Sequence, residues 1–207
     1  MQNTFPATFS VVSTQALVTE VILAYGLGEI ADCKLQYVGV NDTFKVTLVN
    51  KATYYLRVYR SQWRSYDEVT YEVEILNHLH RKGISVAHPV PSKDGSFIQV
   101  IQATEGPRCV VIFTTAAGKE PDYDVDPESK AYQYGLAVAH LHHASDDFTS
   151  TTTRAPLDID FLFRQTIEPV RPYLLHRPDD WAFVQAYAER FYQRLSGWPP
   201  TALDWGF

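Results

Sequence analysis

Hydrophobic and polar residues alternate along the first third of the chain in three short stretches. These stretches are 34–40, 44–49 and 53–59, separated by the turn-forming residues 41–43 and by Asn50-Lys51. A period of two places successive side chains on opposite faces of a sheet. The pattern therefore predicts three antiparallel strands joined by tight turns.

Helical spacing flanks these strands on both sides. Ser13 and Thr14 offer an N-cap for a first helix, which Gly26 ends. A second helix is predicted over 65–82 and is followed by Gly83. Its apolar positions recur every three or four residues, at Val69, Val73, Leu76 and Leu79.

Two further strands complete the first half of the chain. The prolines of 86–91 favour an extended segment, and strands are predicted over 96–102 and 108–113. The order is then helix, three strands, helix, two strands. This order predicts an α+β fold with a five-stranded antiparallel sheet and one inserted helix.

After residue 116 the pattern becomes helical throughout. Helices are predicted over 128–144, 158–175 and 179–195, with Pro169 and Pro172 breaking or kinking the middle one. We therefore expect two regions, a sheet-containing lobe over 1–116 and a helical lobe over 117–207.

Composition narrows the class of protein. The 207 residues are 45% hydrophobic and 20% charged, as in ordinary globular domains, and the net charge of -6 argues against a nucleic-acid partner. The apolar stretches are too short to cross a bilayer. Two distant cysteines, Cys33 and Cys109, fit a reducing compartment, so a cytoplasmic location without membrane contact is expected.

The sequence offers little evidence of a metal site or of other common catalytic motifs. It contains no GxxxxGK[ST], no GxSxG and no HExxH. His140 and His143 are spaced to share a helix face, but no third ligand accompanies them. No metal-binding residue is therefore assigned.

The order of elements resembles a kinase N-lobe, in which a basic strand residue pairs with a helix carboxylate. Six segments in the same order carry a more specific resemblance: Gly39–Val46, Leu56–Arg60, Glu72–Leu79, Ser85–Pro91, Ala117-Gly118 and Gly135–His142. In these segments the chain is similar to the aminoglycoside phosphotransferase and choline-kinase-like family, which includes bacterial homoserine kinases and related stress kinases.

The resemblance implies a nucleotide-binding role for two charged residues. Arg57 is at the position of the family's phosphate-holding cation, and Glu72 matches its ion-pair carboxylate. Alternatives remain open at this stage. Arg60 is a second cation nearby, Glu68 and Glu74 are other carboxylates on the helix, and Arg57 could simply face solvent.

The resemblance also implies backbone contacts to the nucleotide. Gly39 and Asn41 belong to the turn that would cover the phosphates, although the same turn could be a plain hairpin without a ligand. Phe113 and Thr115 are at the family's hinge, where the backbone would contact adenine. ATP with Mg²⁺ is thus the implied nucleotide.

The family's catalytic residues are expected beyond this chain. Its HGDxHxxN loop and its later metal-binding aspartates are absent, and the loop would follow Phe207. We therefore assign no catalytic residue, place the Mg²⁺ ligands outside the chain and expect no turnover from the chain alone. The implied acceptor is a small-molecule hydroxyl. The alternative is a non-catalytic nucleotide- or partner-binding module, of unknown oligomeric state.

Overall fold

The computed structural model describes residues 7–119 and 125–199. The chain divides into two compact units, Met1–Thr153 and Arg154–Phe207. The first unit holds the sheet and two long helices, and the second is helical. The lobe boundary expected after residue 116 stays a prediction. The expected end of the helical lobe, 200–207, lies outside the described residues.

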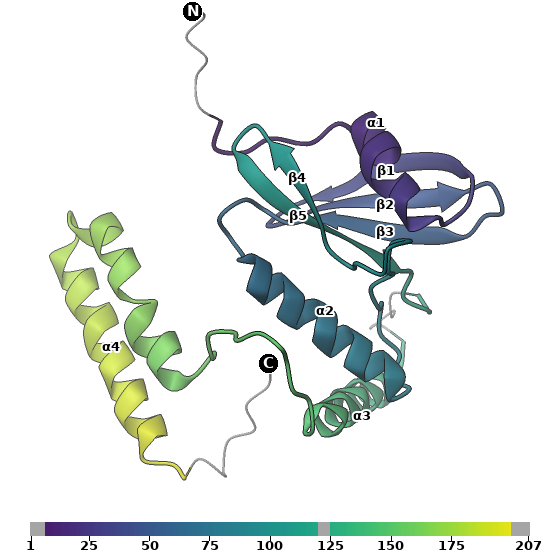
Figure 1. The fold of residues 1–207 in the computed structure, drawn as a ribbon. Helices are drawn as coiled ribbons and strands as arrows, with labels where there is room; N and C mark the ends of the chain where they lie inside the picture. The colour runs from purple at the N-terminus through teal and green to yellow at the C-terminus, as the bar shows by residue number, and fades with distance from the viewer. Residues whose placement is uncertain (1–6, 120–124, 200–207) are drawn as a thin grey trace, which may run out of the picture. The chain divides into compact units, whose positions relative to one another are not determined.

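Five antiparallel strands form one sheet in the order β1-β2-β3-β5-β4 (Figure 1). The strands are β1 (Ile30–Val38), β2 (Asp42–Leu48), β3 (Thr53–Val58), β4 (Gln99–Ala103) and β5 (Gly106–Thr114). The predicted sheet is therefore confirmed. Strand β1 begins four residues earlier than its alternation suggested, and β4 begins three residues later.

A short N-terminal helical segment covers one face of the sheet. It consists of α1 (Thr14–Ala16), a π-helical turn η1 (Leu17–Val21) and a 3-10 turn η2 (Ile22–Tyr25). The Ser13 hydroxyl accepts the first-turn N–H of Ala16 at 3.4 Å. Gly26 ends the segment with φ of +65°, a conformation that favours glycine.

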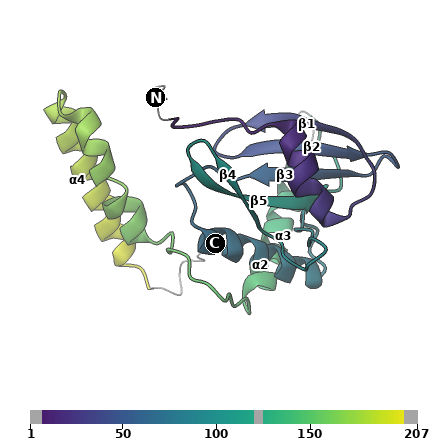
Figure 2. The same ribbon diagram turned by 45° about the horizontal axis from the view of Figure 1, so that its top comes forward.

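Helix α2 (Tyr66–Arg81) covers the other face (Figures 1 and 2). Ser65 and Glu68 form a reciprocal capping box at its start, as Ser-x-x-Glu sequences do. Val69 and Val73 are buried against Val111 of β5, as their spacing predicted. Alternate residues of the strands thus contact different helices, and each face of the sheet has its own core.

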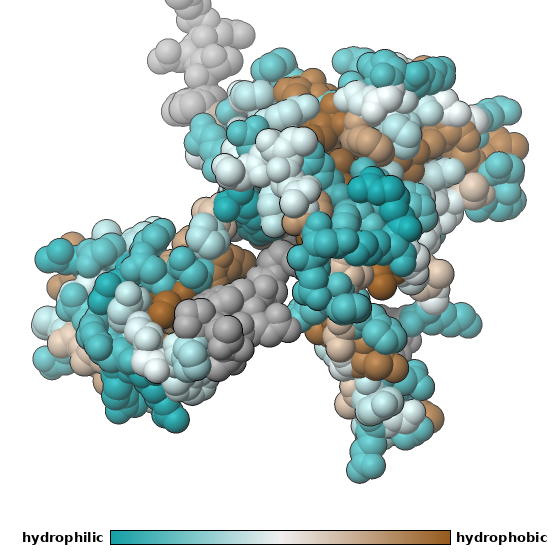
Figure 3. Space-filling model, turned by 60° about the horizontal axis from the view of Figure 1, so that its bottom comes forward, coloured by the Kyte–Doolittle hydropathy of each residue, from teal (hydrophilic) through white to brown (hydrophobic). Residues whose placement is uncertain are grey.

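Helix α3 (Pro127–Ser145) packs on the C-terminal half of α2. Ala144 is buried with Leu79 of α2, and the His78 ring is hydrogen-bonded at 3.0 Å to the Ala144 carbonyl. Leu141 packs against the same cluster, whereas Tyr134 and Leu136, nearer the start of α3, are 69% and 44% exposed. Figure 3 shows such apolar side chains, in brown, reaching the surface between polar ones.

The second unit consists of two antiparallel helical stretches. The first contains η3 (Phe161–Gln165) and η4 (Glu168–Leu174), and the second is α4 (Pro178–Ser196). The prolines of 168–174 reduce the predicted middle helix to π-helical and 3-10 turns. Phe163 stacks on Phe191 of α4 with ring centroids 6.0 Å apart. In the described part of the chain, no helix has the length and apolarity that a bilayer crossing requires.

Candidate nucleotide-binding site

Arg57 lies on the α2 side of the sheet because its strand neighbours point the other way. Leu56 and Val58 are fully buried against the N-terminal helical segment. With a period of two, Arg57 must point to the opposite face. There it meets α2, so the burial of its two neighbours is what directs the guanidinium toward Glu72.

Arg57 and Glu72 form a close ion pair. The Arg57 Nη1 and Glu72 Oε1 atoms are 2.5 Å apart, and the side chains are 36% and 30% exposed. The other candidate carboxylates have different partners. Glu68 bonds Arg64 at 2.7 Å, and Glu74 accepts hydrogen bonds from the loop after α3. The structure therefore selects Glu72 as the partner of Arg57.

Aromatic rings surround the ion pair. The guanidinium carbon of Arg57 is 4.9 Å from the centroid of Phe113 and 5.7 Å from that of Tyr59. Burial works against the charged guanidinium, but Tyr59 and Glu72 offset it, so the pKa of Arg57 is raised. Burial, with the nearby charge of Glu72, also raises the pKa of Tyr59 far above its ordinary value. The site thus places a cation beside a neutral phenol.

An open cavity of about 450 Å³ lies beside the ion pair. Its lining combines β2, β3, α2, the 86–87 segment and the end of β5: Thr43, Tyr55, Arg57, Glu72, Leu76, Val86, Ala87, Phe113, Thr114 and Ala116. Apolar walls with a single cation at one side suit a flat aromatic ring joined to an anionic group. The cavity volume falls within the range of small-molecule sites.

The last residues of β5 are held in place by residues 88–90, which follow α2 in the sequence. The Val90 N–H donates to the Ile112 carbonyl at 2.8 Å, and the Thr114 N–H donates to the His88 carbonyl at 2.9 Å. Thr115 and Ala116 follow this paired region. Their backbone N–H and C=O groups make no backbone hydrogen bond to the described residues, and so remain able to bind a heterocycle.

The structure brings some predicted site residues to the cavity and not others. Arg57, Glu72 and Phe113 line it. The Thr115 hydroxyl instead donates to the Thr53 carbonyl at 2.6 Å. Gly39 and Asn41 are in the turn before β2 but not in the lining, and neither has a positive φ. Their nucleotide contacts stay predictions.

Asn41 has a structural partner that the sequence did not reveal. Its side-chain carbonyl accepts the backbone N–H of Arg60 at 3.2 Å, which ties the turn to the end of β3. The Arg60 guanidinium lies over Phe9, 5.6 Å from its centroid, and not in the cavity. Of the two candidate cations, only Arg57 therefore reaches the cavity.

Sequence reasoning missed two lining residues. Thr43 is the register partner of Arg57 in β2, and Tyr55 precedes Arg57 by two residues, so both share its face of the sheet. The strand register would have placed them in the site, because residues directly opposite each other on paired strands, or two apart on one strand, share a face of the sheet.

In the described ranges, no group of three or more His, Cys, Asp or Glu residues is arranged to hold a metal.

Comparison with known families decides the assignment. The model of the phosphotransferase enzyme family matches residues 39–207. The chain belongs to this family. The match covers the turn before β2, both members of the ion pair and the helical second half, and it confirms the resemblance found in the motifs.

Relatives and solved structures agree with the family. A protein of Deinococcus radiodurans of uncharacterized function is 37% identical over 204 residues, covering 99% of this chain and 58% of its own length. The homoserine kinase of Neisseria meningitidis serogroup B is 27% identical over 124 residues, covering 60% of this chain and 38% of that protein. The chain therefore spans only part of the relatives that it matches.

An amicoumacin kinase, solved with AMP-PNP, Ca²⁺ and Ami, shares the fold. It aligns with a TM-score of 0.69 at 18% identity, covering 91% of this chain and 55% of that one. At this identity the likeness supports the kinase-like α+β fold and nothing finer. The predicted fold class is thereby confirmed.

Proposed function

We propose that the cavity beside Arg57 binds ATP, and that the chain is the nucleotide-binding part of a phosphotransferase acting on a small-molecule hydroxyl. The observation that carries the proposal is the Arg57–Glu72 ion pair, 2.5 Å long, at the edge of an apolar cavity. Membership of the phosphotransferase family supplies the reaction class.

Each part of the nucleotide has a matching surface. Arg57 would bind the phosphate oxygens, with Glu72 holding the guanidinium in position. The apolar walls, among them Leu76 and Val86, would enclose the adenine ring. The backbone at Thr115 and Ala116 would provide hydrogen bonds to the ring edge, and the turn at Gly39 and Asn41 would cover the phosphates.

The acceptor class follows from what related proteins act on. The names of the homoserine kinase and amicoumacin kinase specify substrates that are small molecules. We extend to this chain only the class, a small-molecule hydroxyl. The sequence contains no His-Gly-Asp, so we propose that this chain contributes nucleotide binding and not the base or the Mg²⁺ ligands. A cytoplasmic location also stays a prediction.

Equilibrium titration with ATP tests the proposal. Arg57→Met should weaken ATP binding at least about tenfold, or about 1.4 kcal/mol. Arg64→Met is the matched control, because Arg64 also pairs with an α2 carboxylate, 2.7 Å away, but does not line the cavity. Its ATP affinity should stay unchanged. Absence of ATP binding by the unmodified chain, or equal losses in both variants, would refute the proposal.

A further inference from the structure

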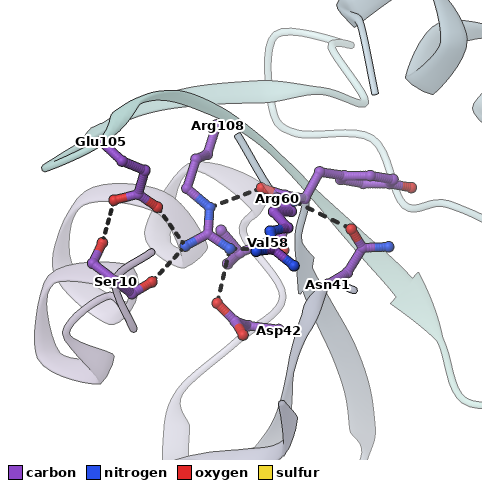
Figure 4. A network of polar contacts seen from close by, with 8 residues as sticks. Ser10, Asn41, Asp42, Val58, Arg60, Glu105 and Arg108 are labelled. Carbon is purple, nitrogen blue, oxygen red and sulfur yellow. Dashed lines mark hydrogen bonds and ion pairs between the residues drawn. The ribbon is translucent and has the colours of Figure 1, made fainter. Parts of the chain in front are cut away.

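A buried arginine joins four segments next to the turn that precedes β2. The guanidinium of Arg108 donates to the Tyr59 carbonyl at 2.8 Å, the Ser10 carbonyl at 2.8 Å and the Val58 carbonyl at 3.3 Å. It also contacts the carboxylate of Glu105 at 3.5 Å. Figure 4 shows these contacts converging on a single side chain.

Arg108 also forms an ion pair with Asp42. Nη2 of Arg108 and Oδ2 of Asp42 are 2.8 Å apart, and both side chains are fully buried. Asp42 is the first residue of β2 and directly follows the turn at 39–41. The next residue, Thr43, lines the cavity opposite Arg57. The ion pair therefore holds the turn at the point where the chain enters the site.

Asn41, the residue before Asp42, is fixed as well. Asn41 accepts the N–H of Arg60 just beyond β3, while Asp42 is held through Arg108 to the carbonyls of Val58 and Tyr59. Both attachments tie the turn to the end of the same strand that carries Arg57. The geometry of turn and cation is thus set by one rigid group of contacts.

Stability alone is a poor explanation for this pair. Burying two charges has a large desolvation cost, and apolar replacements of similar volume are often neutral or stabilising. The second carboxylate oxygen of Asp42, Oδ1, is buried and has no hydrogen-bond partner among the described residues, which adds to the cost. What the pair does provide is a fixed direction for the backbone of the turn.

We infer that Arg108 and Asp42 are positioning residues that preorganise the turn at 39–41 for the phosphates of the nucleotide. The inference rests on the proposed ATP site. It assigns the buried pair a role in the binding of phosphate and none in the binding of the adenosine moiety, which the cavity walls and the end of β5 would contact. This difference between the two parts of the ligand gives the test.

The test compares ATP with adenosine in a paired apolar variant, Arg108→Met with Asp42→Leu. The dissociation constants of both ligands and the thermal midpoint are measured. We expect ATP to bind about tenfold more weakly while adenosine binding changes by less than about twofold. Leu17→Ala is the control, since it opens a cavity in the core under the N-terminal helical segment and leaves every residue of the turn and of the ion pair unchanged. It should lower the thermal midpoint and leave the ratio of the two constants unchanged.

Three results would overturn the inference. Unchanged ATP affinity, or equal losses for ATP and adenosine, would make the pair purely structural. A ratio that also changes in Leu17→Ala would show that the readout merely follows stability. If the paired variant lost its cooperative melt, Arg108→Lys would replace it, because lysine keeps the charge but cannot bond several acceptors in fixed directions. The ratio of the ATP and adenosine dissociation constants in that variant would then decide whether the pair positions the turn.

Failure of the inference can be distinguished from failure of the proposed function. If Arg57→Met weakens ATP binding while the paired variant does not, the ATP site stands and the positioning role is rejected. If the unmodified chain binds neither ATP nor adenosine, both are rejected together.

Discussion

The two faces of the sheet are built from the same strands but have different compositions. The face under the N-terminal helical segment is mainly apolar along β2 and β3, with Phe44, Val46, Leu56 and Val58 at 0% exposure and the buried ion pair of Asp42 with Arg108 at its end. The face under α2 also has an apolar core, but it includes Arg57 and Thr43 at the edge of a cavity. One face stabilises the lobe, and the other combines packing with a charged site.

The difference shows how one strand can serve both purposes. Alternation lets Leu56 and Val58 anchor β3 while the residue between them carries charge into the cavity. Substitutions of the apolar residues on the first face should therefore change stability, and substitutions of the Arg57–Glu72 pair on the second should change ligand binding. The predictions below test this separation.

The largest effect is expected on the apolar face. Phe44→Ala removes a fully buried ring and should lower the free energy of unfolding by about 3–5 kcal/mol. Val100→Ala, at a side chain that is 51% exposed on β4, should change it by less than about 0.5 kcal/mol. Urea denaturation measures both. A small loss at Phe44 would contradict the assignment of this face as the main core.

The next effect is expected in the site. Glu72→Gln removes the charge that orients Arg57, and should weaken ATP binding about fivefold to tenfold, or about 1–1.4 kcal/mol. Stability should change little, since the pair is partly exposed to solvent. Calorimetric titration and thermal melting separate the two quantities. A large loss of stability with unchanged affinity would make the pair structural.

A smaller effect is expected on the side of α2 that faces away from Arg57. Glu74 accepts hydrogen bonds from the hydroxyls of Ser150 and Thr151 and from the Thr151 N–H. Glu74→Gln should weaken these by about 1 kcal/mol, so that residues 150–152 exchange their amide hydrogens roughly fivefold faster. ATP affinity should not change. An altered ATP affinity would show that the two sides of α2 are coupled, and would contradict the assignment of ligand binding to the Arg57 side alone.

The smallest effect concerns pH. The rings of His80 and His88 stack with centroids 3.6 Å apart. Burial, then the neighbouring His80, lowers the pKa of His88 below its ordinary value of 6.5. A lowered histidine pKa means that the folded state binds its proton less readily than the unfolded state. The free energy of unfolding that His88 contributes should therefore be fully present above pH 6.5 and decrease as the pH falls below it.

A thermal melt series from pH 8 to pH 5.5 measures this effect. We expect the unmodified chain to lose less than about 3 °C through this histidine. In His80→Gln the loss should be smaller, because the second ring no longer opposes protonation of His88. An identical pH profile in the variant would show that the stacked pair does not contribute.

Much of the fold could be predicted because its signals are local. Alternation gave the strands, and the spacing of Val69 and Val73 gave α2 with its buried side. The Arg57–Glu72 pair was predicted from the order of elements in a known family. The cavity walls were not, because Thr43 and Tyr55 join the site through strand register.

The buried network was beyond local reasoning. Arg108 and Asp42 are 66 residues apart, and their sequence contexts predicted only the start of a strand and a turn. One signal was available: an arginine that begins an apolar strand, Cys109 to Phe113, requires several acceptors if it is buried. The exposure of Tyr134 and Leu136 in α3 could not be predicted either, because the spacing of apolar residues does not show what covers them.

The central claim is that the α2 side of the sheet holds the nucleotide and the opposite side does not. Hydrogen–deuterium exchange of the unmodified chain, with and without saturating ATP, tests it directly. The account predicts slower exchange in 38–44 and 112–116 and no change in the N-terminal helical segment 14–25. Protection of 14–25, or no protection anywhere, would contradict it.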